Sequence, residues 1–175
     1  MSHSVKSADD LYFNKDHNMV RLAVRDFVNK EINPHIDEWE EQRMVPLKKL
    51  FKKMGKLGFL GIRYDPKYGG QGLDYWYETV FLEELGRIQG LGLAVAITVQ
   101  TNMATPAIDE FGNDYLKETF LKAAIAGEKV GAIAVTEPGA GSDVSALATT
   151  ARREGDHYVI NGSKMYITNG TQADF

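Results

Sequence analysis

The feature that most constrains the fold is a change of hydrophobic period at Gly131. Up to residue 130 the apolar residues recur every three or four positions, which is typical of amphipathic helices, whereas after it they form short runs separated by Gly and Asn turns. The two periods belong to different secondary structures. The sequence therefore predicts an α+β chain, with an all-α domain over residues 16–130 followed by the beginning of an antiparallel β-barrel or sandwich domain over residues 131–175.

Within the helical part, the clearest pattern places Val20, Val24 and Phe27 on one face of a helix that Pro34 is expected to end. Further helices are expected over residues 46–55, 77–88, 92–110 and 113–127. The polar residues 1–15 precede these helices, and we expect them to be flexible.

Composition excludes several functional classes. The formal net charge of −4 gives no basic stripe for nucleic acid, and the absence of cysteine excludes a disulfide framework. The four histidines lack metal-ligand spacing, so we expect no metal site. No apolar run approaches the ~20 residues of a membrane span, and the N-terminus does not resemble a signal peptide. We expect a cytoplasmic protein, or a mitochondrial matrix protein if a leader is removed.

A glycine-rich loop stands out at residues 136–143, where the sequence reads T-E-P-G-A-G-S-D. It follows an apolar run, 133–135, that is suited to a buried strand. Its glycines allow the backbone to approach a ligand closely, and the hydroxyls of Thr136 and Ser142 flank the turn. The residue types alone equally allow a plain turn in which Ser142 or Asp143 caps the next segment.

A second stretch follows some twenty residues later, at 158–170. It contains two short strand-like runs around Asn161-Gly162, a dipeptide that predicts a two-residue hairpin turn, and it ends in another Asn-Gly. The chain then stops close behind these runs, whose apolar residues need a larger sheet to cover them. We therefore expect an N-terminal portion of a longer protein.

Together the two motifs, T-E-P-G-A-G-S-D and N-G-S-K-M-Y-I-T-N-G, resemble those of the acyl-CoA dehydrogenase family of flavoproteins. The resemblance runs from Asp16 to Phe175 and is specific because both motifs occur in the same order. It implies FAD-dependent α,β-dehydrogenation of a fatty acyl-CoA thioester to the trans-2-enoyl-CoA. In such enzymes a carboxylate removes the α-proton, a hydride passes to flavin N5, and electrons leave to an electron-transferring flavoprotein. The family also implies a homotetramer, or a dimer, at full length.

The resemblance also implies roles for individual residues. Val135 and Thr136 are expected at the pyrimidine edge of the flavin, Thr168 at its O4 and N5, and Ser142 beside the CoA. The cofactor-binding candidates are Ile133, Ala134, Val135, Thr136, Gly141, Ser142, Tyr166, Ile167 and Thr168. The substrate-binding candidates are Ser142, Thr101 and Met103. Tyr166 departs from the motif, because many members carry tryptophan there.

The sequence offers no catalytic base. Glu84 falls beside the apolar stripe of its helix, where a paired glutamate is commoner than a catalytic one. Glu137 is expected to fix the loop through backbone hydrogen bonds. The family's base lies in a C-terminal helical domain that this chain does not contain, so we expect the chain by itself to be inactive.

Two alternatives remain, an acyl-CoA oxidase-like flavin enzyme and a non-catalytic regulatory protein that binds a fatty acyl group or flavin.

Overall fold

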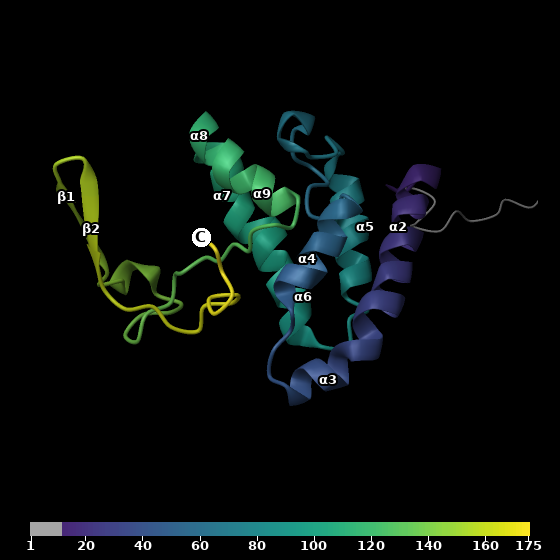
Figure 1. Ribbon diagram of the computed structural model, residues 1–175, viewed down its shortest axis with the longest axis horizontal. Helices are drawn as coiled ribbons and strands as arrows, with labels where there is room; N and C mark the ends of the chain where they lie inside the picture. The colour runs from purple at the N-terminus through teal and green to yellow at the C-terminus, as the bar shows by residue number, and fades with distance from the viewer. Residues whose placement is uncertain (1–11) are drawn as a thin grey trace, which may run out of the picture.

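The computed structural model describes residues 12–175. Residues 1–11, which form most of the stretch expected to be flexible, lie outside the described part of the chain. The described residues form a compact group of helices, from which an extended segment leads to a β-hairpin and then returns, so that the C-terminus lies beside the helices (Figure 1). The predicted α+β class is confirmed.

Helices account for most of the chain up to residue 125. They are α2 (Lys15–Phe27), α3 (Ile36–Glu41), α4 (Leu47–Lys56), α5 (Tyr75–Leu85), α6 (Leu91–Thr98), α7 (Thr105–Phe111), α8 (Asp114–Leu116) and α9 (Lys122–Ile125). Three π-helical segments extend or join them, namely Val28–Ile32, Val99–Ala104 and Lys117–Leu121. As a result α6 and α7 form one continuous rod, and so do α8 and α9.

The first helical run ends just before Pro34, as the sequence predicts, because the π segment after α2 stops at Ile32. Pro34 lies in a 3₁₀ turn, Asn33–His35, that leads into α3. Proline lacks an N–H group, but the N–H groups in the first turn of a helix have no partner within the helix, so none is lost. The chain therefore changes direction at Pro34 without leaving helical geometry.

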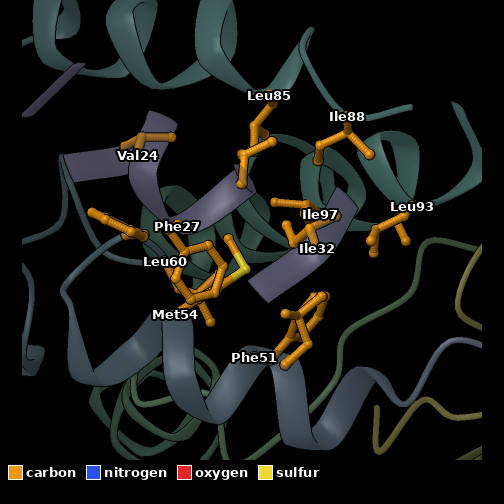
Figure 2. Packing of buried hydrophobic residues seen from close by; sticks show 14 of the residues in the cluster. Val24, Phe27, Ile32, Phe51, Met54, Leu60, Leu85, Ile88, Leu93 and Ile97 are labelled. Atoms are coloured by element: carbon orange, nitrogen blue, oxygen red, sulfur yellow. The ribbon is translucent and has the colours of Figure 1, made fainter. Parts of the chain in front are cut away.

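The hydrophobic core lies between α2, α4, α5 and α6. Figure 2 shows Phe51 and Met54 of α4 pointing toward Phe27 and Ile32, with Ile97 of α6 nearby. All five side chains are buried, and α4 turns its lysines away from them. Burial of an apolar side chain of this size contributes about 1.5–3 kcal/mol. Through Ile97, α6 therefore packs into the same core as α2 and α4.

The rod from Leu91 to Phe111 has 21 residues and contains an 18-residue window with a mean hydropathy of 1.3, so length and composition alone would allow it to cross a membrane. It is not an uninterrupted apolar run, because Gln100, Asn102 and Asp109 lie within it. The test is weak, because the core helix of a globular domain passes it as well. Ile97 and Gln100 are buried against neighbouring helices, as expected for such a core helix.

The hairpin consists of β1 (Thr150–Glu154) and β2 (His157–Asn161), paired antiparallel with Glu154 opposite His157. Gly155 and Asp156 form its two-residue turn, and Gly155 has the left-handed φ of 62° that such a turn requires. All residues of both strands are exposed. The hairpin is thus a two-stranded ribbon with no covering layer among residues 12–175.

The hairpin turn predicted at Asn161-Gly162 was therefore wrong. Asn161 is the last residue of β2, and no strand follows it among the described residues. A Cβ atom at Gly162 would lie 2.2 Å from the Thr149 hydroxyl oxygen. Glycine is required here because two segments of the chain approach closely, and the motif alone does not distinguish that need from a turn.

The buried strand predicted at 133–135 also does not form. Ile133 is 36% exposed, and the segment is extended without regular strand pairing. A strand needs a neighbour to complete its backbone hydrogen bonds, and among residues 12–175 none lies alongside in register. A few single bonds hold the segment instead, such as that from the Ala132 N–H to the Phe175 carbonyl at 3.1 Å.

Gln100 connects this extended segment to the helices. Its side-chain amide is buried in the π segment and accepts a hydrogen bond from the Gly131 N–H at 2.7 Å. It also donates to the carbonyls of Ala124 at 3.3 Å and Lys129 at 3.0 Å. One side chain therefore sets the position of the chain where the helical period ends.

We expect Gln100→Leu to lower the free energy of unfolding by about 2 kcal/mol or more, because each buried polar group left without a partner costs about 1–3 kcal/mol. Denaturant unfolding followed by circular dichroism measures this change. Gln89→Leu is the matched control, since the Gln89 side chain is exposed. Equal losses in the two variants would show that the amide bonds of Gln100 contribute nothing specific.

Candidate functional site

The loop at 136–143 is closed by a tight turn. The Glu137 N–H donates to the Ala140 carbonyl at 2.8 Å, and the Ala140 N–H donates back to the Glu137 carbonyl at 3.2 Å. A Cβ atom added at Gly139 or Gly141 would meet nothing within 4 Å. The backbone at both glycines therefore faces open space, which is the access that a ligand lying on the loop needs.

The carboxylate of Glu137 is buried beneath this turn. It accepts hydrogen bonds from the backbone N–H groups of Ala148 at 2.6 Å and Thr149 at 3.0 Å, and from the Lys164 ammonium at 2.8 Å. Lys164 is the main cause that lowers the pKa of Glu137 from 4.5 to about 2. Glu137 is thus a permanently charged acceptor that fixes the loop, as its place in the sequence suggested, and not a base.

Lys164 joins the two motifs. Besides Glu137, its ammonium group binds the Val135 carbonyl at 2.9 Å. The next residue, Met165, donates its N–H to the Thr136 carbonyl at 3.0 Å. The segments around residues 136 and 165 therefore lie side by side, although nearly thirty positions separate them in the sequence.

The second motif presents its residues without regular secondary structure. Tyr166 is 86% exposed and has a left-handed φ of 57°. Ile167 and Thr168 are half-buried, and Asn169 is buried with a φ of 67°. Two left-handed residues so close together are uncommon outside turns and ligand clamps. Thr168 therefore lies on a segment whose conformation is set by its surroundings.

The cofactor-binding candidates of the first motif differ in exposure. Val135 and Thr136 are half-buried, whereas Ile133, Ala134, Gly141 and Ser142 are exposed. The backbone N–H groups of Val135, Thr136 and Thr168 donate to no other backbone group among residues 12–175. Free N–H donors and neighbouring hydroxyls suit the acceptor-rich edge of a flavin ring. The residues present therefore fit the cofactor that the motifs imply.

Thr101 and Met103 do not lie together. Thr101 is buried, its hydroxyl bound to the Ile97 carbonyl at 3.1 Å, whereas Met103 is 49% exposed. Positions two apart on a helix point in nearly opposite directions. Thr101 instead lines a cavity of about 510 Å³, which lies between α5, α7 and residues 59–64 and contains none of the glycine-loop residues.

Two titratable side chains of this cavity, Glu78 and Tyr64, already have partners. The Glu78 carboxylate binds Arg63 at 2.7 Å and Asn102 at 2.5 Å. Tyr64 shares a hydrogen bond with the Thr105 hydroxyl at 2.7 Å, and burial raises the pKa of Tyr64 to about 12. Neither Glu78 nor Tyr64 is free to act as a base. These two groups therefore give no support for catalysis in the cavity.

Glu84 is a structural residue. Its side chain is 2% exposed and makes a bidentate pair with Arg25, at 2.9 and 2.7 Å, while Arg87 binds it at 2.8 Å. The hydrogen bonds from Arg25 are the main cause that lowers the pKa of Glu84. A carboxylate with a lowered pKa is a poor proton acceptor, so the pairing interpretation holds.

Two residues of the site were missed in the sequence. Lys164 occupies the middle of a strand-like run, and its link to Glu137 depends on the tertiary fold. Asn169 was assigned only to a turn, although Asn-Gly also signals a left-handed residue whose side chain is free to bind backbone. Among residues 12–175 no group of three or more His, Asp or Glu residues is placed to hold a metal ion.

The chain matches two domain families along nearly its whole length. The N-terminal domain of acyl-CoA dehydrogenases matches residues 14–128, and their middle domain matches residues 132–175. One relative is a 3-(aryl)acrylate reductase of Clostridium sporogenes, 41% identical over 164 residues, which cover 94% of this chain and 43% of the relative. The chain thus spans less than half the length of this relative.

Solved structures give the same result. The crystal structure of acyl-CoA dehydrogenase from Geobacillus kaustophilus has a TM-score of 0.87 and 42% identity, covering 93% of this chain and 42% of that one. The acyl-CoA dehydrogenase of Bacillus anthracis complexed with FAD has a TM-score of 0.88 and 35% identity, covering 97% and 29%. Likeness at this level extends over both the helices and the loops.

The pair formed by Glu137 and Lys164 predicts a pH dependence. Because the folded pKa of Glu137, about 2, lies below its ordinary 4.5, the charged carboxylate stabilises the fold above pH 4.5, and this stabilisation is lost as the pH falls toward 2. In Lys164→Met the largest cause of the shift is gone. We therefore expect a smaller loss of unfolding free energy over this pH range, measured by denaturant titration.

Lys56→Met is the control for this experiment, because Lys56 is exposed and forms no ion pair with a described residue. It should keep the acid dependence of the wild-type protein. If Lys164→Met also keeps it in full, the lowered pKa of Glu137 does not depend on Lys164.

Proposed function

Because this chain belongs to the acyl-CoA dehydrogenase family, we propose that the full-length protein binds FAD and dehydrogenates a fatty acyl-CoA between its α and β carbons. In this proposal residues 16–130 form the N-terminal helical domain, and residues 131–175 supply the first cofactor-binding loops of the middle domain. FAD, when bound, accepts the hydride that leaves the β carbon. The proton-abstracting carboxylate is assigned to the part of the family's length that this chain does not span.

The observation that carries the proposal is the set of free donors on two loops locked together. Lys164 and the Met165 N–H hold the second motif against the first, and within residues 12–175 the N–H groups of Thr136 and Thr168 have no backbone partners. Donors fixed before the reaction stabilise negative charge that develops on a flavin ring at no further cost of reorganisation. The FAD complex of the Bacillus anthracis relative supports the choice of cofactor.

The other candidate binding residues are not equally well placed to contact a ligand. Tyr166, exposed beside the loops, is available to cover the flavin ring, and Ser142 is free to contact the CoA. Met103, on the exposed side of the central rod, is the better candidate to line the acyl chain, because the Thr101 hydroxyl already binds its own helix. We further propose an electron-transferring flavoprotein as electron acceptor, a homotetramer or dimer as the assembly, and a cytoplasmic or mitochondrial matrix location.

The visible absorption spectrum of the full-length protein tests the proposal. Flavin bands that bleach when an acyl-CoA is added without oxygen are the expected result. Bands that bleach and recover rapidly in air would indicate an acyl-CoA oxidase instead. Bands that persist unchanged would leave a non-catalytic binding protein, and the absence of flavin after reconstitution with FAD would contradict the cofactor assignment.

A reductase is the second candidate, because a relative with 41% identity is a 3-(aryl)acrylate reductase. Reduction of a carbon–carbon double bond is the reverse of dehydrogenation and needs the same placement of flavin and substrate carbons. The flavin is therefore first reduced chemically without oxygen, and an enoyl-CoA or an aryl acrylate is added. Reoxidation by the free acrylate but not by the thioester would favour the reductase.

We expect Thr168→Ala to slow flavin reduction by acyl-CoA more than it weakens acyl-CoA binding, since a donor near flavin N5 acts mainly on the reacting state. Stopped-flow absorbance gives both quantities from the dependence on substrate concentration. Thr150→Ala on the exposed strand β1 is the matched control and should change neither. Equal losses of rate and affinity in Thr168→Ala would argue against this role.

A further inference from the structure

Asn169 binds two separate parts of the fold. Its side-chain amide donates hydrogen bonds to the Ala96 carbonyl on α6 at 3.0 Å and to the Gly131 carbonyl at 3.2 Å. The residue is 9% exposed. One side chain on the second motif therefore contacts the central core helix and the residue at which the helical domain passes into the loops.

The position of Thr168 depends on this contact. Tyr166 and Asn169 both have left-handed backbones, and the Gly170 N–H closes a turn onto the Ile167 carbonyl at 2.9 Å. The Tyr166 side of this turn is exposed, whereas the Asn169 side is buried. Asn169 is thus the point at which the turn carrying Thr168 is attached to the core.

The attachment uses only the NH₂ group of the amide. The Asn169 side-chain oxygen is buried without a hydrogen-bond partner among residues 12–175. The two bonds that hold the side chain are therefore both donated by this NH₂ group. The NH₂ donors determine the orientation of the side chain, and aspartate, which has none, cannot replace them.

We propose that Asn169 is a positioning residue that holds Thr168 at a fixed place relative to α6 and Gly131, and so orients the Thr168 donors toward the flavin. This inference rests on the proposed function, because the position of Thr168 matters for chemistry only if flavin binds. It goes beyond that function because it names Asn169, whose side chain binds backbone carbonyls, as the residue that sets the position of the Thr168 donors.

Two substitutions separate the amide from the backbone conformation. Asn169→Gly keeps access to the left-handed φ but removes the donors, and Asn169→Asp keeps the shape but replaces the donors with acceptors. Gln172→Ala is the matched control. The Gln172 amide also makes two bonds to the helical domain, with the Val45 carbonyl at 2.9 Å and the Leu47 N–H at 3.2 Å, but it lies outside the turn of Thr168.

The experiment uses the full-length protein and begins with the flavin content and spectrum of the wild type. FAD affinity is then measured for each variant by titration of the apoprotein, and the reduction potential is measured for flavin that stays bound. We expect both Asn169 variants to bind FAD about ten-fold more weakly, the equivalent of one lost buried hydrogen bond. We also expect a shifted reduction potential in both, and neither change in Gln172→Ala.

Wild-type affinity and potential in Asn169→Gly would overturn the inference, since only the backbone conformation would then matter. Equal changes in Gln172→Ala would overturn it as well, because general loosening of the C-terminal segment would suffice. If Asn169→Gly does not fold, Asn169→Asp decides by the same two readouts. A wild-type protein that takes up no FAD would refute the proposed function first, and the inference with it, and is recognised before any variant is made.

Discussion

The ion pair between Glu137 and Lys164 is the interaction on which the loops depend. Neither motif has a sheet around it among the described residues. The two nevertheless lie side by side, because the buried Glu137 carboxylate accepts hydrogen bonds from Lys164 and from two backbone N–H groups. A buried charge is costly without partners and stable only when its lone pairs are filled. This requirement holds the glycine turn and the second motif in one arrangement.

Side-chain amides hold the loops in place where they meet the helices. Gln100, Asn169 and Gln172 each bind backbone groups far away in the sequence. An extended segment without a neighbouring strand would otherwise leave its peptide groups unpaired. These amides therefore attach residues 131 and 169–172 to the helical core at a few defined points, close to the positions where the cofactor donors are expected.

The arrangement separates stability from chemistry. The buried carboxylates at 78, 84 and 137 all have cationic partners, and Tyr64 remains neutral. Among residues 12–175, the N–H donors at 135, 136 and 168 instead have no backbone partner. Such a surface binds and polarises a ligand without taking a proton from it, which agrees with a base supplied from elsewhere in the family's length.

The sequence by itself determined the helical domain, the change of structure near Gly131 and the family, because periodicity and paired motifs are local properties. It also singled out the two motifs that the structure brings side by side near residues 136 and 165. It did not locate the hairpin turn: Asn161-Gly162 carries the stronger dipeptide signal, but Gly162 serves a close approach to Thr149, and Gly155-Asp156 makes the turn. Nor did it predict that 133–135 stays unpaired, that Thr101 and Met103 diverge, or that Lys164 and Asn169 connect the loops. Those outcomes depend on which groups meet across long stretches of chain, and only the tertiary structure decides that.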